Sequence, residues 1–141
     1  MKRIVLDTSV LVAALRSRSG AGNAVLRLVA ERRLVLLATP PLFLEYEEVL
    51  HRPEHRLVHG LSPQQLESVL EELAALIEPV ELHFRWRPQV HDTNDEMVLE
   101  AAINGDASAL VTYNTGDFSV AAERFGVAVL TPAQLLRKVK P

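Results

Sequence analysis

The stretch Lys2-Arg3-Ile4-Val5-Leu6-Asp7-Thr8-Ser9-Val10-Leu11 opens the chain and combines an apolar run, an acid and a second apolar pattern. Residues 3–6 predict a short buried strand, and residues 9–16 predict the helix that follows it. Asp7 stands between them, where the strand ends. An isolated acid in apolar surroundings is costly unless a cation is brought to it. The opening segment therefore predicts both the start of a sheet and a candidate site at its edge.

The rest of the chain repeats this alternation of strands and helices. Proline directly after Ser or Thr marks several helix starts, because proline suits the first helical position and a hydroxyl can cap it. Further strands are predicted at 34–38, 79–83, 107–112 and 126–130, and further helices at 21–31, from Thr39 to about 50, and from Ser62, Thr93 and Thr131. Strands separated by helices predict an α/β fold in three layers around a parallel sheet. Residues 1–141 are expected to form one domain.

Composition narrows the classes of protein that fit. Apolar residues make up 48% and charged residues 23% of the 141, which is ordinary globular composition. The absence of cysteine excludes disulfides and cysteine-based zinc sites and favours a cytoplasmic protein. No signal peptide and no run long enough for a membrane span is visible. A net charge of −3 weakens a pure nucleic-acid-binding module. It weakens a metal-dependent nuclease less, because bound cations change the local sign.

Three further acids stand at places comparable to that of Asp7. Glu45 lies within an apolar helical segment, Asp95 in the first turn of a predicted helix, and Asp117 a short turn after a predicted strand. In open parallel sheets ligands bind beyond the carboxyl ends of the strands. A doubly wound sheet would therefore bring these four acids to one edge.

Converging acids with no basic residue alternating among them favour a hard divalent cation, and carboxylates suit Mg²⁺ or Mn²⁺. Such a site holds one ion, or two about 3.5–4 Å apart, and drives in-line attack of water on phosphorus. Neighbouring polar residues could orient the carboxylates or bound water. The residues predicted for this supporting role are Thr8, Ser9, Asp92, Thr112 and Asn114.

Each acid taken alone also has a structural interpretation. Asp7 could cap the following helix, and Asp95 could be an ordinary acid of a first turn. Glu45 could belong to a solvated helix face, and Asp117 could be a turn residue. Only the joint arrangement favours a site.

With these residues in place, the chain resembles PIN-domain ribonucleases, of the kind found as toxins in VapBC-type toxin–antitoxin pairs. Four segments in the same order carry the resemblance, at 4–11, 44–53, 92–99 and 110–118. In that family the acid of the first segment is a metal ligand, which implies this role for Asp7. The resemblance places Glu45, Asp95 and Asp117 at the other acidic positions. Glu48 remains an alternative to Glu45, because the two lie on overlapping faces of one helix.

The resemblance implies a three-layer α/β/α fold with a mostly parallel sheet of about five strands. It implies Mg²⁺- or Mn²⁺-dependent cleavage of single-stranded RNA. It also suggests a homodimer, and inhibition by an antitoxin protein that reaches into the acidic pocket. The chain departs from the family at Thr93-Asn94, where many relatives carry proline and another acid, which puts the role of Asp92 in doubt.

Other features have weaker functional interpretations. His51, His55 and His59 share fourfold spacing, but the intervening Pro53 favours a solvated loop over a metal-binding helix. Arg52 and Arg56 in that loop are possible RNA contacts. Trp86 could stack on a base or anchor a loop, and the basic residues at 137–140 could complement a helix end or grip phosphate. The stripe from Leu66 to Leu76 predicts a core-facing helix.

Two other functions compete with nuclease activity. A catalytically silent module that binds nucleic acid or protein could keep the same fold, but such a module has no use for four convergent carboxylates. A phosphotransfer enzyme working through Asp7 would need a second aspartate two residues later, where Ser9 stands. The sequence therefore favours the metal-dependent ribonuclease.

Overall fold

The computed structural model of the chain describes residues 2–83 and 92–139. Strands and helices alternate along these residues, with one three-helix insertion between the second and third strands. The elements are β1 (Lys2–Leu6), α1 (Thr8–Arg16), α2 (Ala21–Ala30), β2 (Leu34–Ala38), α3 (Pro40–Leu50), α4 (Pro53–His59), α5 (Pro63–Leu76), β3 (Ile77–Pro79), α6 (Thr93–Asn104), β4 (Ala109–Val111), α7 (Thr115–Arg124), β5 (Ala128–Leu130) and α8 (Pro132–Lys138).

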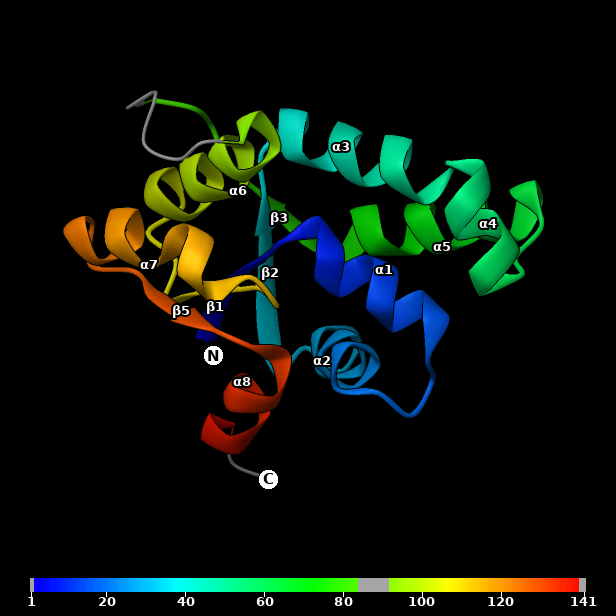
Figure 1. Ribbon diagram of the computed structural model, residues 1–141, viewed down its shortest axis with the longest axis horizontal. Helices are drawn as coiled ribbons and strands as arrows, with labels where there is room; N and C mark the ends of the chain where they lie inside the picture. The colour runs from blue at the N-terminus through cyan, green and yellow to red at the C-terminus, as the bar shows by residue number, and fades with distance from the viewer. Residues whose placement is uncertain (1, 84–91, 140–141) are drawn as a thin grey trace.

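The described strands form one five-stranded sheet in the order β3-β2-β1-β4-β5, and every neighbouring pair is parallel. Helices α6 and α7 lie on one side of it, α1 and α2 on the other, and α8 packs against α2 (Figure 1). The prediction of a three-layer α/β/α fold around a parallel sheet is confirmed.

Strands β1 and β4 are the place where the winding of the sheet reverses. The chain leaves β1 toward β2 on one side, and it leaves β4 toward β5 on the other. Leu6 pairs with Val111, so the residues that follow these two strands emerge side by side. In open α/β sheets the crevice outside the carboxyl ends of strands at such a reversal is the usual ligand site.

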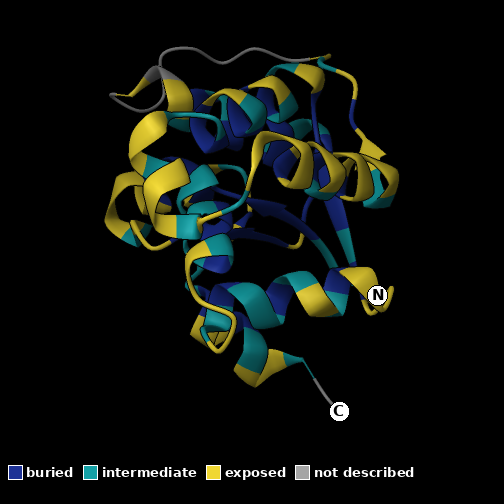
Figure 2. Cartoon of the chain, turned by 90° about the vertical axis from the view of Figure 1, so that its right-hand side faces the viewer, coloured by how far each residue is buried: buried dark blue, intermediate teal, exposed yellow. Residues whose placement is uncertain are grey.

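The strands supply most of the core. Residues Ile4 to Leu6 of β1 and Ala109 to Val111 of β4 are buried, because helices cover both faces of the central strands (Figure 2). The apolar stripe of α5 also faces inward, since Leu66, Leu70 and Leu73 are buried. The predicted core face of this helix is therefore confirmed.

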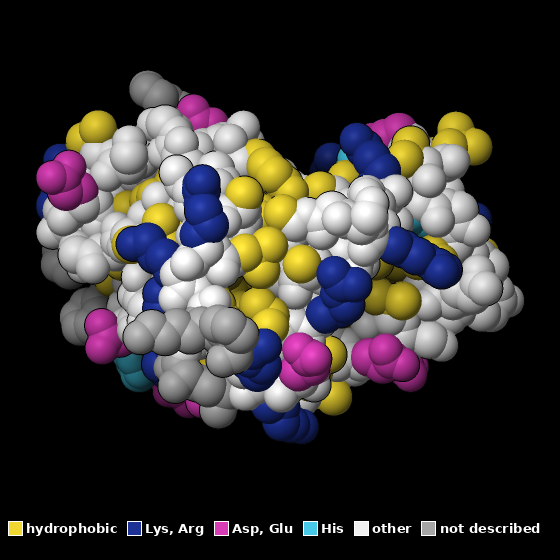
Figure 3. Space-filling view, turned by 90° about the horizontal axis from the view of Figure 1, so that it is seen from below, with side chains coloured by type: hydrophobic (Ala, Val, Ile, Leu, Met, Phe, Trp, Pro, Cys, Tyr) yellow, Lys and Arg dark blue, Asp and Glu magenta, His cyan; other side chains and the backbone are white. Residues whose placement is uncertain are grey.

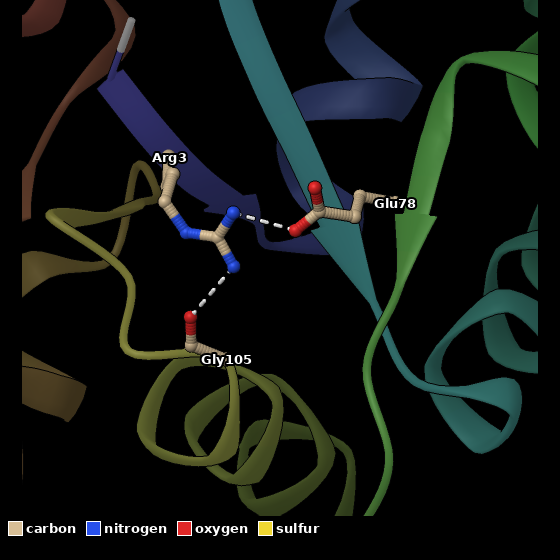
Figure 4. A network of polar contacts seen from close by, with 3 residues as sticks. All are labelled: Arg3, Glu78 and Gly105. Atoms are coloured by element: carbon tan, nitrogen blue, oxygen red, sulfur yellow. Dashed lines mark hydrogen bonds and ion pairs between the residues drawn. The ribbon is translucent and has the colours of Figure 1, made fainter.

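The amino-terminal end of β1 is tied to its surroundings by Arg3. Its guanidinium forms an ion pair with Glu78 of β3 and donates a hydrogen bond of 3.1 Å to the carbonyl of Gly105 (Figure 4). These contacts join β1, β3 and the turn after α6 at the end of the sheet opposite to the carboxyl ends of the strands.

Several predicted local structures are wrong in detail. The third strand lies at Ile77–Pro79, not 79–83, because helix α5 runs directly into it. The segment after Pro53 is a helix, not a loop, since proline ends α3 and then occupies the first turn of α4. Helix α7 was not predicted. Asp92 rather than Thr93 caps α6, with its carboxylate accepting from the N–H of Asn94.

On the side where α2 and α8 lie, apolar side chains gather across the middle of the face with Lys and Arg around them (Figure 3). No helix in the described ranges is long and apolar enough to cross a bilayer. The interpretations of Trp86 and of Lys140 concern positions outside the described residues.

Candidate active site

A pocket of about 470 Å³ lies where β1 and β4 end. Its walls come from α1, α3, the start of α6 and the residues that follow β4. Four carboxylates line it, namely those of Asp7, Glu45, Asp92 and Asp95. Three of the four predicted acids, Asp7, Glu45 and Asp95, thus share one cavity although they lie far apart in the sequence.

Asp7 is held by two hydroxyl groups. It occupies the N-cap position of α1, yet its side chain accepts no hydrogen bond from the helix backbone. Its Oδ2 instead accepts from Ser9 Oγ at 2.8 Å and from Thr112 Oγ1 at 2.7 Å. The residue is 7% exposed, and its Oδ1 has no hydrogen-bond partner among the described residues. Helix capping therefore does not account for this acid, which leaves one oxygen available to a ligand.

Thr112 connects β4 to Asp7. Its fully buried hydroxyl donates to Asp7 and accepts from the backbone N–H of Asn114 at 2.9 Å. The backbone repeats the link, because the N–H of Asp7 donates to the carbonyl of Val111. Of the predicted supporting residues, Ser9 and Thr112 contact Asp7 directly, while Thr8 and Asn114 line the pocket.

Glu45 is placed by its neighbour Tyr46. The Tyr46 hydroxyl donates to the carbonyl of Leu6, which fixes α3 against the end of β1. Burial, together with the nearby charge of Asp7, raises the pKa of the Tyr46 hydroxyl, so it stays a neutral donor. Because Glu45 precedes Tyr46 on the same helix, this anchor places Glu45 at the pocket, and the residue as a whole is 7% exposed.

Glu48 lies in a different environment from Glu45. It is exposed to solvent and forms an ion pair of 2.9 Å with Arg52 one helical turn later. The pKa of Glu45 is raised overall. Burial and the charge of Glu48 are the largest causes, Arg52 opposes them, and Asp92 adds to them. The geometry therefore brings Glu45 and not Glu48 into the pocket.

Asp95 is the most strongly perturbed acid of the site. Burial, followed by the charges of Asp7, Asp92 and Asp117, with a smaller contribution from Glu96, raises its pKa to about 6. The causes after burial are all negative charges, so Asp95 lies among carboxylates that repel it. A cation in the pocket would reverse this effect.

Asp117 lies at the edge of this cluster. It is exposed in the first turn of α7 and does not line the pocket, although its charge reaches Asp95. The structure thus brings three of the predicted acids into the cavity and leaves the fourth beside it.

The donor set fits a hard divalent cation. The pocket offers carboxylate and hydroxyl oxygens and no sulfur, which suits Mg²⁺ or Mn²⁺. Within residues 2–83 and 92–139, no three His, Asp or Glu side chains lie close enough together to hold one ion as they stand. Mg²⁺ usually keeps several waters and is held through one or two carboxylates. A shared cavity is therefore the relevant geometry for it.

Three polar or aromatic residues line this pocket that sequence reasoning did not assign to it, namely Arg16, His55 and Tyr113. The predicted RNA contacts lie elsewhere: Arg52 is paired with Glu48, and Arg56 lines a separate cavity between α4 and α5. No local pattern marks the three missed positions, because each reaches the pocket only through the packing of its element.

The fold and the pocket together define a class of protein. A doubly wound parallel sheet with carboxylates at its reversal point is typical of an enzyme or binding site for charged ligands. Residues 3–116 match the family model of the PIN domain, and the chain therefore belongs to the PIN-domain family, whose fold is that of nucleases. The match ends one residue before Asp117. No curated protein matches the chain.

Proposed function

We propose that this protein is a Mg²⁺- or Mn²⁺-dependent endoribonuclease that hydrolyses phosphodiester bonds of single-stranded RNA. The observation that carries the proposal is the convergence of Asp7, Glu45 and Asp95, from three separate segments, on one pocket at the reversal point of the sheet. Among the described residues, none of these carboxylates forms an ion pair with Lys or Arg. The negative charge of these carboxylates is therefore available to bind a metal cation.

The residues divide the work as follows. Asp7, Glu45 and Asp95 would hold the ion or ions, with Asp117 close enough to contribute charge. Ser9 and Thr112 fix the orientation of the Asp7 carboxylate by donating to one of its oxygens. A bound divalent ion would lower the pKa of a bound water and would neutralise charge on the phosphate oxygens.

We also propose that the enzyme is a toxin of the VapC kind, acting as a homodimer and restrained by an antitoxin protein. Support for this role comes only from the resemblance of the four segments. Induced expression should then arrest bacterial growth, and the arrest should disappear in an Asp7→Asn variant. Growth that continues during expression of an RNA-cleaving protein would contradict the toxin role alone.

The enzymatic proposal is tested with purified protein and a labelled single-stranded RNA. We expect cleavage with Mg²⁺ or Mn²⁺, and none in excess EDTA. Asp7→Asn should remove activity while circular dichroism and thermal unfolding stay close to wild type, because charge and not volume is lost. Asp106→Asn is the matched control, since Asp106 is exposed and does not line the pocket.

Cleavage that survives chelation would contradict the metal mechanism. Near-normal turnover of Asp7→Asn would show that this pocket does not catalyse the cleavage, whereas absence of cleavage by the wild-type protein would support the silent binding module. A nuclease contaminant would be recognised because its activity would be equal in all variants.

A further inference from the structure

The pocket has a second side that the metal chemistry does not use. One face of α1 runs along it, formed by Ser9, Val12, Ala13 and Arg16 at helical spacing. The face starts beside Asp7 and ends at Arg16, the last residue of the helix. A nine-residue helix spans about 13 Å, so Arg16 and Asp7 stand at opposite ends of α1 although both line the same cavity.

Arg16 places a positive charge on this side of the pocket. It is exposed, and among the described residues it forms no ion pair and no side-chain hydrogen bond, even though acids line the same pocket. His55 of α4 lies with it, since both also line a small neighbouring cavity. The imidazole of His55 likewise has no partner within the described ranges. An imidazole can donate a hydrogen bond to a phosphate oxygen in either protonation state.

Tyr113 adds an aromatic side chain to the lining of the pocket, and it forms a rim of the pocket together with Arg16 and His55. It directly follows Thr112 and is 46% exposed, so part of its ring is open to a ligand. Its hydroxyl extends to the start of α2, where a Cβ at Gly22 would lie 3.5 Å from it. A Cβ at that distance would make an ordinary van der Waals contact, so the far end of the ring lies close to the start of α2 while part of Tyr113 remains accessible to solvent.

We propose that Arg16, His55 and Tyr113 bind the unpaired nucleotide next to the cleaved bond. Arg16 and His55 contact the phosphate that follows along the strand, and Tyr113 stacks on a base. This inference rests on the proposed ribonuclease function and names its substrate class. A base in a duplex is already stacked on both faces, whereas an unpaired base is free to stack on a protein ring. The rim therefore selects single strands.

Binding is measured by fluorescence anisotropy with a labelled 12-nucleotide RNA, in the Asp7→Asn background and with Mg²⁺ present, so that cleavage plays no part. Arg16→Ala is expected to weaken binding about tenfold and to lower the salt slope of log K by about 0.7, as for one lost phosphate contact on a single strand. Arg18→Ala is the control, because Arg18 is exposed and does not line the pocket. Arg16→Lys should recover most of the affinity.

The ring and the imidazole are tested in the same assay. Tyr113→Leu is expected to weaken binding about tenfold, within the range for loss of one stacked base, without changing the salt slope. Tyr113→Phe keeps the ring and should bind like the parent. His55→Ala should weaken binding severalfold, whereas His51→Ala, whose imidazole faces Glu67 at 3.2 Å outside the pocket, should not.

Three outcomes would overturn the inference: Arg16→Ala binding as tightly as Arg18→Ala, Tyr113→Leu binding as tightly as Tyr113→Phe, or a blunt duplex of the same sequence binding as tightly as the single strand. Thermal unfolding of each variant shows whether a loss reflects misfolding, and the conservative variants keep the test decisive if one does misfold. Failure of the wild-type protein to cleave RNA would contradict the proposed function. The binding results would still decide whether these three residues bind single-stranded RNA.

Discussion

The two ends of β1 differ in how their charged side chains are paired. At its start, the guanidinium of Arg3 meets the carboxylate of Glu78 and the carbonyl of Gly105, so charge and hydrogen-bonding groups are matched. Just past its end, the Asp7 carboxylate accepts from two neutral hydroxyls, and three further acids line the same pocket. One short strand therefore carries a neutralised end and an end with excess negative charge.

The difference separates stability from function. Matched groups at the start of the strand contribute modestly to stability and leave nothing for a ligand. The unmatched carboxylates destabilise the folded chain, as the raised pKa of Asp95 shows. Such a cost persists in a native protein when a ligand relieves it, and a divalent cation is the ligand that the donor oxygens fit.

The largest expected effect distinguishes two glutamates on one helix. Glu45→Gln should lower kcat/KM for RNA about a hundredfold or more, equivalent to about 2.7 kcal/mol of transition-state stabilisation, because a carboxylate that faces the ion is lost. Glu48→Gln should stay within about twofold, since Glu48 faces solvent and Arg52. Steady-state cleavage kinetics of both variants decide between them. A larger loss for Glu48→Gln would show that the pocket is not the catalytic centre.

The alternation of apolar strands and proline-marked helices was sufficient to predict the layers and the parallel sheet. These features depend on local patterns that each segment carries by itself. The resemblance of four segments to PIN-domain proteins also indicated the family, which the match over residues 3–116 confirms. The toxin subtype, the metal and the roles of the individual residues remain predictions.

The failures have identifiable physical causes. Helix α7 was missed because Asn114 and Gly116 at its start are typical turn residues. Helix α4 was missed because a proline that ends one helix can begin the next. The choice between Glu45 and Glu48 depended on the Tyr46 hydroxyl reaching the carbonyl of Leu6, which is a tertiary contact. No spacing along the chain encodes it.

A smaller effect should appear in the stability of the metal-free protein. Asp95 has a pKa of about 6 when folded, above its ordinary value of 3.8, so between these values the folded state binds more protons than the unfolded state. Its contribution to stability is therefore complete below about pH 4 and is lost as pH rises through about 6. Asp95→Asn should flatten this part of the curve and stabilise the EDTA-treated protein at pH 7 by roughly 1 kcal/mol, allowing for solvent screening.

Urea unfolding of both proteins between pH 4 and 7.5 measures this effect. The same measurement with added Mn²⁺ tests whether a bound cation relieves the repulsion. Mn²⁺ should raise the midpoint of the wild-type protein more than that of Asp95→Asn, because the ion relieves repulsion that the variant has already reduced. Parallel stability curves for the two proteins, with and without Mn²⁺, would contradict the idea that Asp95 carries the electrostatic strain of this site.

The smallest effect is expected at the start of β1. Arg3→Met keeps an apolar stem of similar length but removes the ion pair with Glu78 and the hydrogen bond to Gly105. Both partners of the ion pair are about half exposed, so the loss of stability should be no more than about 1 kcal/mol. RNA cleavage should be unchanged, because the substitution lies at the opposite end of the strand from Asp7. If Arg3→Met instead lowered kcat while its urea midpoint stayed near wild type, the two ends of β1 would be coupled, and the separation of a stabilising end from a functional end would fail.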